Sequence, residues 1–268
     1  RKGEEVKFLS KCYDLRGYID GLGPEDAVIV EASTASFYWA DRIEANGAIC
    51  HIIDPRKFKI IREPWNKTDK QDSRNMAKAL WVYIVTEEFG IPTVYKPDRV
   101  VRELRKLFSY YQQLNRQISM LKNTIHAICV ENGVDLESTR YLLSRRYGEE
   151  RLKELELSIA SEVIIESSLK LLWKLGEEKE RMSQEIILVG EPLKEAVKLL
   201  ITIRGITPLI ALAFLTDVGN IERFRSVRKM NAYLGLVPKI KESGGKERSG
   251  HINRESRKLT HTLLTQSI

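Results

Sequence analysis

The sequence predicts an α/β region followed by an all-α region. The first prediction rests on two short apolar runs, residues 27–30 and 48–53, that flank a segment of helical character. The second rests on apolar residues that recur at alternating steps of four and three between positions 100 and 128. A further, mostly helical segment follows, so the expected domains are residues 1–97, 98–198 and 199–268.

Composition points to a globular protein with an acidic partner. Of the 268 residues, 43% are hydrophobic and 30% are charged, and the formal net charge is +7. A basic chain of this kind favours a polyanion such as nucleic acid as its partner. The cysteines Cys12, Cys50 and Cys129 are scattered and predict no disulfide framework, which suits a reducing cytoplasm. The sequence contains no signal peptide and no membrane-length apolar run, so we expect no membrane partner.

The α/β region is predicted to begin close to the start of the sequence. Residues 4–9 are typical of a strand leaving a hairpin, and residues 27–30 of a strand buried on both faces. Residues 36–46 predict a helix that stops at Gly47, and residues 48–53 predict a second strand. Strand, helix and strand over this length indicate a parallel crossover, and ligands gather at the carboxyl ends of such strands.

Two acidic residues directly follow the predicted strands. Glu31 ends the first and Asp54 follows the second, so each is either a site residue or simply the first residue to reach solvent. His51 lies within the second strand and is expected to be packed rather than to bind a ligand.

Residues 66–77 open an amphipathic helix that carries two carboxylates one turn apart. Asp69 and Asp72 share a face that Met76 and Leu80 continue, so we expect both carboxylates to lie along the protein interior. Carboxylates held this close repel each other, and a divalent metal ion between them is the usual remedy. Alternatively, Asp69 is a favourable first-turn residue and Asp72 is solvated.

The middle of the chain predicts a helical arm. Its apolar seam is sustained over about four heptads, which is typical of a coiled coil or a long helical hairpin. Asp98 is expected to cap the helix and Gly133 to end it, and a second helical stretch is expected from about residue 149 to 188. A dimerising coiled coil and an intramolecular hairpin remain equally open. The seam consists of Val100, Leu104, Leu107, Tyr111, Leu114, Ile118, Leu121, Ile125 and Ile128.

Residues 200–215 predict a helix-hairpin-helix unit. A helix ends, Gly205 permits a tight turn, and Thr207-Pro208 begins the next helix. Such a unit offers backbone amides to a DNA phosphate, so Arg204, Gly205 and Thr207 are candidate nucleic-acid contacts. The alternative is an ordinary helical hairpin packed in a core.

A basic segment with a Ser-Gly-Gly turn closes the chain. Ser243 beside Gly244 and Gly245 would let a phosphate approach closely, and nearby cations would neutralise it. Read alone, the turn is structural. The candidate nucleic-acid-binding residues of this segment are Arg225, Arg228, Lys246, Arg248, Arg254, Arg257 and Lys258.

These motifs resemble one family in two separate places. Glu31 and the Thr68-Asp69-x-x-Asp72 helix start resemble the RuvC-like, ribonuclease-H-type domain of the DEDD transposases of the insertion-sequence 110/1111 family. The run F-R-S-x-R-x-x-x-A-Y-L-G-L-V-P at 224–238, followed by Ser-Gly-Gly and a basic segment, resembles the C-terminal transposase domain of the same family. That family's acidic tetrad begins with an Asp on the first strand, which this sequence lacks, and we expect the chain to be shortened at its ends.

The resemblance implies a specific fold and chemistry. It implies a RuvC-like domain without its first strand, a coiled-coil arm and a C-terminal helical transposase domain. Ser243 would be the nucleophile of a DNA recombinase, with Glu31, Asp69 and Asp72 as catalytic residues that hold Mg²⁺ or Mn²⁺. The site would form between protomers of a homodimer or homotetramer in the prokaryotic cytoplasm, at the nucleoid.

The implied partners are donor DNA, target DNA and a non-coding guide RNA, the bridge RNA. Two alternatives stay open. One is a RuvC-like nuclease that cuts branched DNA such as Holliday junctions and needs the carboxylates but not Ser243. The other is a non-catalytic nucleic-acid-binding module, an alternative that the missing first Asp keeps open.

Overall fold

The computed structural model describes residues 14–58, 68–86, 90–243, 246–252, 260, 262 and 263. The chain divides into two compact units, Arg1–Lys96 and Pro97–Ile268. The strand predicted at residues 4–9 lies outside the described residues.

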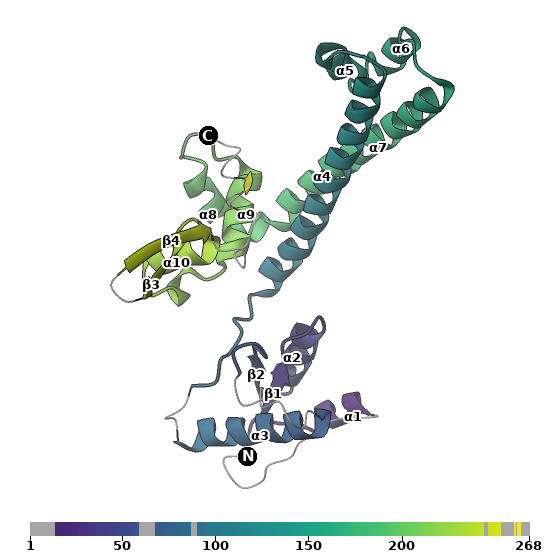
Figure 1. Cartoon of the computed structure of the whole chain (residues 1–268). Coiled ribbons are helices and arrows are strands. Elements are labelled where there is room, and N and C mark those ends of the chain that lie inside the picture. Colours follow the sequence, from purple (N-terminus) through teal and green to yellow (C-terminus); the bar gives the residue numbers. More distant parts are fainter. Residues whose placement is uncertain are drawn as a thin grey trace. The chain divides into compact units, whose positions relative to one another are not determined.

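The first unit contains the predicted strand, helix and strand (Figure 1). The two strands pair in parallel, with Ala27 opposite Ile49 and Glu31 opposite Ile53, which confirms the predicted crossover. Gly47 ends the intervening helix with a φ of 86°, a backbone conformation that glycine adopts without strain. The elements are α1 (Leu15–Asp20), β1 (Ala27–Glu31), α2 (Ser36–Ala45), β2 (Ile49–Ile53) and α3 (Asp69–Thr86).

Strand β1 has helices packed on both of its faces, as its uninterrupted apolar run predicts. Val28 and Val30 pack with residues of α1 and α2 around Ile19 and Ile43. Ile29, on the other face, packs with residues of α3 around Ile53 and Phe58. Because side chains alternate along a strand, Glu31 belongs to the same face of β1 as Ile29, which is the face that α3 covers.

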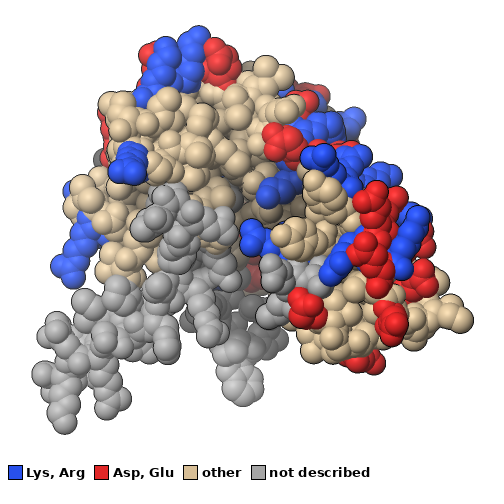
Figure 2. All heavy atoms as spheres, turned by 90° about the horizontal axis from the view of Figure 1, so that it is seen from above, with Lys and Arg blue, Asp and Glu red and all other residues tan. Residues whose placement is uncertain are grey.

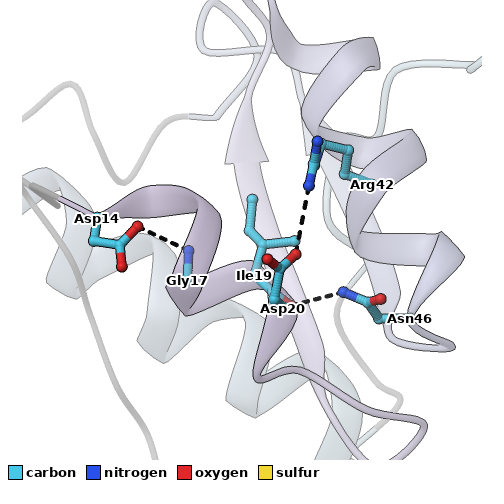
Figure 3. A network of polar contacts seen from close by, with 6 residues as sticks. All are labelled: Asp14, Gly17, Ile19, Asp20, Arg42 and Asn46. Carbon is cyan, nitrogen blue, oxygen red and sulfur yellow. Dashed lines mark hydrogen bonds and ion pairs between the residues drawn. The ribbon is translucent and has the colours of Figure 1, made fainter.

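Polar contacts hold α1 against α2 (Figure 3). Asp14 caps α1 by accepting a hydrogen bond from the backbone N–H of Gly17 at 2.9 Å. The side-chain amide of Asn46 donates to the carbonyl oxygen of Ile19 at 2.8 Å, and Arg42 reaches Asp20 at 3.5 Å. These contacts fix the helix pair that supports one face of β1.

The second unit is mainly helical and begins with the predicted arm. Its elements are α4 (Arg99–Glu131), α5 (Leu136–Leu142), α6 (Gly148–Lys153), α7 (Ile159–Val189), α8 (Lys194–Leu200), α9 (Pro208–Val218), α10 (Val227–Leu234), β3 (Pro238–Ser243) and β4 (Lys246–Ile252), with single 3₁₀ turns at Glu191–Leu193 and Ile221–Arg223.

The arm is an antiparallel helical hairpin of α4 and α7 (Figure 1). Leu104 and Phe108, near the start of α4, pack with Ile186 near the end of α7. Ile125, near the end of α4, packs with Ile165 near the start of α7. Every residue of the predicted seam is buried or half-buried, so the heptad pattern is confirmed and its partner lies in the same chain.

Two local predictions for the arm hold only in part. Asp98 is the N-cap residue of α4, as predicted, but its side chain makes no capping hydrogen bond. The second long helix begins at Ile159 rather than near residue 149, because Ser158 adopts extended backbone and its Oγ accepts from the N–H of Ser161 at 3.2 Å. Gly133, with a φ of 72°, follows the end of α4 as predicted. None of the helices among the described residues is both long and apolar enough to cross a membrane.

The predicted helix-hairpin-helix arrangement is present as α8, a turn and α9. Gly205 turns the chain with a φ of 90°. Thr207 caps α9 by accepting from the N–H of Ile210 at 3.3 Å, and Pro208 occupies the first helical position. The buried side chains of α9 pack on both arm helices through Leu212 and Ala213, which ties this unit to the base of the arm.

Candidate acidic site and nucleic-acid interface

Thr68 caps the start of α3. Its hydroxyl oxygen accepts a hydrogen bond from the N–H of Gln71 at 3.2 Å, which satisfies one of the free amides at the helix start. The cap places Asp69 and Asp72 in the first turn, where the helix dipole favours negative charge. The threonine of the Thr-Asp-x-x-Asp motif is therefore a structural residue that sets where the two carboxylates lie.

Glu31 and Asp72 lie on facing surfaces of the first unit. Glu31 is on the α3 face of β1, and Asp72 is one turn before Met76, which packs in the cluster between α3 and the sheet. Asp72 is half-buried, whereas Glu31 and Asp69 are exposed. The expectation that both aspartates lie along the interior is wrong for Asp69, because it precedes the first apolar contact of α3 by two turns.

The described residues contain no cluster of three or more His, Cys, Asp or Glu side chains able to hold a metal ion. Glu31, Asp69 and Asp72, all of which the structure describes, therefore do not form a three-ligand metal site.

Asp54 and His51 have structural surroundings. Asp54 is buried and accepts hydrogen bonds from the backbone N–H of Arg56 at 3.0 Å and its Nε at 3.3 Å. Burial opposes ionisation, but these bonds and the nearby charges of Arg56 and Lys57 outweigh it and lower the pKa of Asp54. His51 packs edge-on to Tyr83 with ring centroids 5.5 Å apart, and burial lowers its pKa, as expected for a packed histidine.

The carboxyl end of α9 is held by residues from three other segments. Arg105 of α4 donates from Nε to the carbonyl oxygen of Thr216 at 3.1 Å, and Arg223 donates from Nε to that of Val218 at 3.0 Å. Cations at this end of a helix are favoured by its dipole. Asp217, which is 2% exposed, accepts from the N–H and hydroxyl of Thr260. Sequence reasoning missed all of these contacts.

Most of the F-R-S…A-Y-L-G run around α10 serves the fold. The guanidinium of Arg223 lies 4.1 Å from the ring centroid of Phe224 and 4.3 Å from that of Tyr233. Ser226 caps α10 by accepting from the N–H of Lys229 at 3.3 Å, and Gly235 ends the helix with a φ of 74°. The candidate contacts Arg225 and Arg228 remain exposed, as do Arg204, Gly205 and Thr207 of the hairpin turn.

Ser243 ends β3 and stands opposite Lys246, the first residue of β4. The strands are antiparallel, and Lys241 stands opposite Arg248. The sequence predicted a turn here but not the two strands that flank it. The candidates Arg254, Arg257 and Lys258 lie outside the described residues.

The net positive charge of the chain is concentrated at its end. Residues 221–268 contain eleven Lys or Arg and four Asp or Glu, a net charge of +7 that equals the charge of the whole chain. On the face shown in Figure 2, basic and acidic side chains lie interleaved where charged residues gather. Pairs such as Glu166–Lys170 and Glu178–Arg181 account for such alternation along α7. A polyanion would therefore be drawn to the last 48 residues.

Comparison with known proteins identifies relatives over most of the chain. Residues 197–268 match the model of the transposase IS116/IS110/IS902 family. A probable family 20 transposase of Pseudomonas aeruginosa is 26% identical over 90% of this chain and 70% of its own length. The transposase of insertion sequence element IS1111A from Coxiella burnetii is 25% identical over 88% of this chain and 63% of its own length. A transposase-like protein of Sinorhizobium fredii is 25% identical over 97% of this chain and 62% of its own length.

Proposed function

We propose that this chain is a member of the IS110/IS1111 family of transposases and a DNA recombinase that cuts and rejoins DNA through Ser243. The observation that carries the proposal is the concentration of the whole net charge, +7, in the same 48 residues that contain Ser243. A serine among cations is suited to phosphoryl transfer, because the cations bring the phosphate to the hydroxyl and offset its charge.

The chemistry requires no oxidant or reductant. Ser243 Oγ attacks the phosphorus of a DNA phosphodiester, the Oγ–P bond forms, and the bond from phosphorus to the departing deoxyribose oxygen breaks. The serine proton ends on that departing oxygen. Attack by a deoxyribose hydroxyl of another DNA end reverses the step, joins the new strand and restores the serine.

The acidic residues support a role for a divalent cation, Mg²⁺ or Mn²⁺. Magnesium is commonly held by one or two carboxylates together with substrate phosphates, so the Asp69 and Asp72 pair has a suitable donor set, with Glu31 on the facing strand. When bound, such an ion would offset the negative charge of the reacting phosphate. The RuvC-like character of the first unit is part of the same proposal.

We also propose a guide RNA and a second copy of the chain as partners. The RNA proposal follows from the family resemblance. For the second copy, the resemblance implies a site shared between protomers, and the arm offers a free apolar surface at the start of α7. There Ile159 is 84% exposed and Val163, one turn later, is 59% exposed. A second chain covering them would bury apolar area.

The covalent adduct is the decisive test. The full chain is expressed with its flanking non-coding DNA, and any co-purifying RNA is sequenced and used to choose the DNA substrate. Wild-type protein should form a denaturant-resistant protein–DNA adduct, and Ser243→Ala should form none while binding the same RNA. Ser249→Ala, on the second strand of the same hairpin, is the matched control and should retain the adduct.

Other outcomes point to other functions. Cleavage that persists in Ser243→Ala but requires the aspartates would indicate a RuvC-like nuclease acting on branched DNA. Binding of DNA without cleavage by the wild-type chain would indicate a non-catalytic nucleic-acid-binding module. An absence of enriched RNA would remove the guide from the proposal.

A further inference from the structure

We propose that Lys241 contacts a DNA phosphate on the face of the β3–β4 hairpin that carries Ser243. The inference rests on the proposed function and deepens it by assigning one more phosphate-binding residue to the site. The sequence motifs drew attention to Lys246 and Arg248 but not to Lys241, which precedes the Ser-Gly-Gly turn.

The strand register brings four residues to one face. In an antiparallel pair, residues directly opposite each other share a face, and the face alternates with each step along a strand. Lys241 is opposite Arg248, and Ser243 is opposite Lys246. Lys241 and Ser243 are two residues apart on β3, so both pairs belong to the same face. Three cationic residues therefore share a face with the proposed nucleophile.

The opposite face carries the opposite charge. Glu242 stands directly across from Glu247, and the next pair on that face is Ile240 with Ser249. The hairpin thus segregates its charges by face instead of pairing them across the strands. Like charges directly opposite each other destabilise a sheet, so both charged faces carry a cost in the free protein.

A DNA backbone on the Ser243 face removes part of that cost. Phosphates would neutralise Lys241, Lys246 and Arg248 together and release bound counterions. The face with Glu242 and Glu247 would repel the same backbone. By register, the face that would attract the DNA backbone is therefore the face to which Ser243 belongs.

A matched pair of charge-neutral variants tests the assignment. Lys241→Gln and Glu242→Gln differ by one position in the sequence and lie on opposite faces of the hairpin. The full chain is titrated with a fluorescent DNA duplex of arbitrary sequence at several salt concentrations, and circular dichroism confirms that each variant is folded. A second duplex of unrelated sequence serves to detect any base-specific contact.

Lys241→Gln should weaken binding to both duplexes and lower the slope of log affinity against log salt by about 0.9, the value for one lost phosphate contact. Glu242→Gln should leave the slope unchanged, and Lys241→Arg should retain the wild-type slope. Equal slopes for Lys241→Gln and wild type would overturn the assignment, as would an effect on RNA binding alone. The slope does not depend on catalysis, so a failure of Ser243 as the nucleophile would be recognised separately in the adduct assay.

Discussion

The hydroxyl oxygen of Thr260 lies 2.6 Å from Oδ2 of Asp217, and both residues are buried. The backbone N–H of Thr260 donates to the same oxygen at 3.2 Å. A carboxylate of α9 thus holds Thr260, a residue that follows β4 in the chain.

Replacing Thr260 with Val should destabilise the second unit. The substitution removes the hydroxyl that donates to the buried carboxylate of Asp217, and the loss of such a buried hydrogen bond costs about 1–3 kcal/mol. Denaturant unfolding monitored by circular dichroism measures the loss. Thr260→Ser retains the hydroxyl and should recover most of the stability. Equal stability of Thr260→Val and wild type would show that the contact is unimportant.

Two glycines of the second unit, Gly176 in α7 and Gly148 in α6, should respond in opposite ways to alanine. Gly176 lies within α7, and an added Cβ there would meet no other atom within 4 Å. Gly176→Ala should therefore stabilise the chain by about 0.8–1 kcal/mol through helix propensity. At Gly148 an added Cβ would lie 2.8 Å from Trp173 Cζ2 and nearer still to the carbonyl oxygen of Leu142. Gly148→Ala should lower the melting temperature, and a rise there would contradict the packing of α6 on α7.

His51 should make the first unit sensitive to acid. Burial lowers its pKa below the ordinary value of 6.5, so the unfolded chain takes up a proton at a higher pH than the folded chain does. The stability that neutral His51 contributes is present above pH 6.5 and is lost as pH falls through the lowered pKa. His51→Phe keeps an aromatic contact to Tyr83 and should reduce the acid-induced fall in melting temperature. His126→Phe, at an exposed position, should leave that fall unchanged, and identical behaviour of the two variants would refute the role of His51.

The two aspartates of α3 should govern metal-dependent cleavage. Asp69→Asn with Asp72→Asn removes both charges while Thr68 still caps the helix, so the first unit should remain folded. Cleavage that depends on added Mg²⁺ should disappear, and binding of Mn²⁺ measured by electron paramagnetic resonance should weaken. Asp54→Asn is not a suitable control because Asp54 is buried, whereas Asp20→Asn changes an exposed carboxylate and should retain cleavage. Unchanged cleavage in the double variant would make the pair structural.

The sequence predicted elements whose signals are local. The structure confirms three such elements: the strand predicted from the apolar run of β1, the helix predicted from the seam of α4, and the α8–α9 turn predicted from Gly205 and Thr207. In each case the residues that form the element lie close together in the sequence. The start of α7 was missed because charged residues from position 149 onwards are equally compatible with a helix and with a loop. Ser158 decides between them, and a single capping serine is a weak signal.

The site could be predicted only in part. The family motifs identified Ser243 and the acidic residues as candidates. They could not show that Phe224 and Tyr233 have a structural role, in which both rings pack against the guanidinium of Arg223. Asp217 and Thr260 are 43 positions apart, and no periodicity links two such residues. Lys241 became a candidate only when the register of β3 and β4 was known, because a shift by one residue would place it on the other face.

The enclosure of the α4 seam by α7 has a consequence for how the protein accumulates in a cell. An arm whose apolar stripe needed another chain would be folded only when the protein was abundant, since the stability of an obligate dimer depends on concentration. Here Leu104, Leu114 and Ile125 are covered by the same polypeptide. The helical hairpin should therefore form without a second copy, so even a few copies made from a weakly expressed gene would be folded before they meet each other.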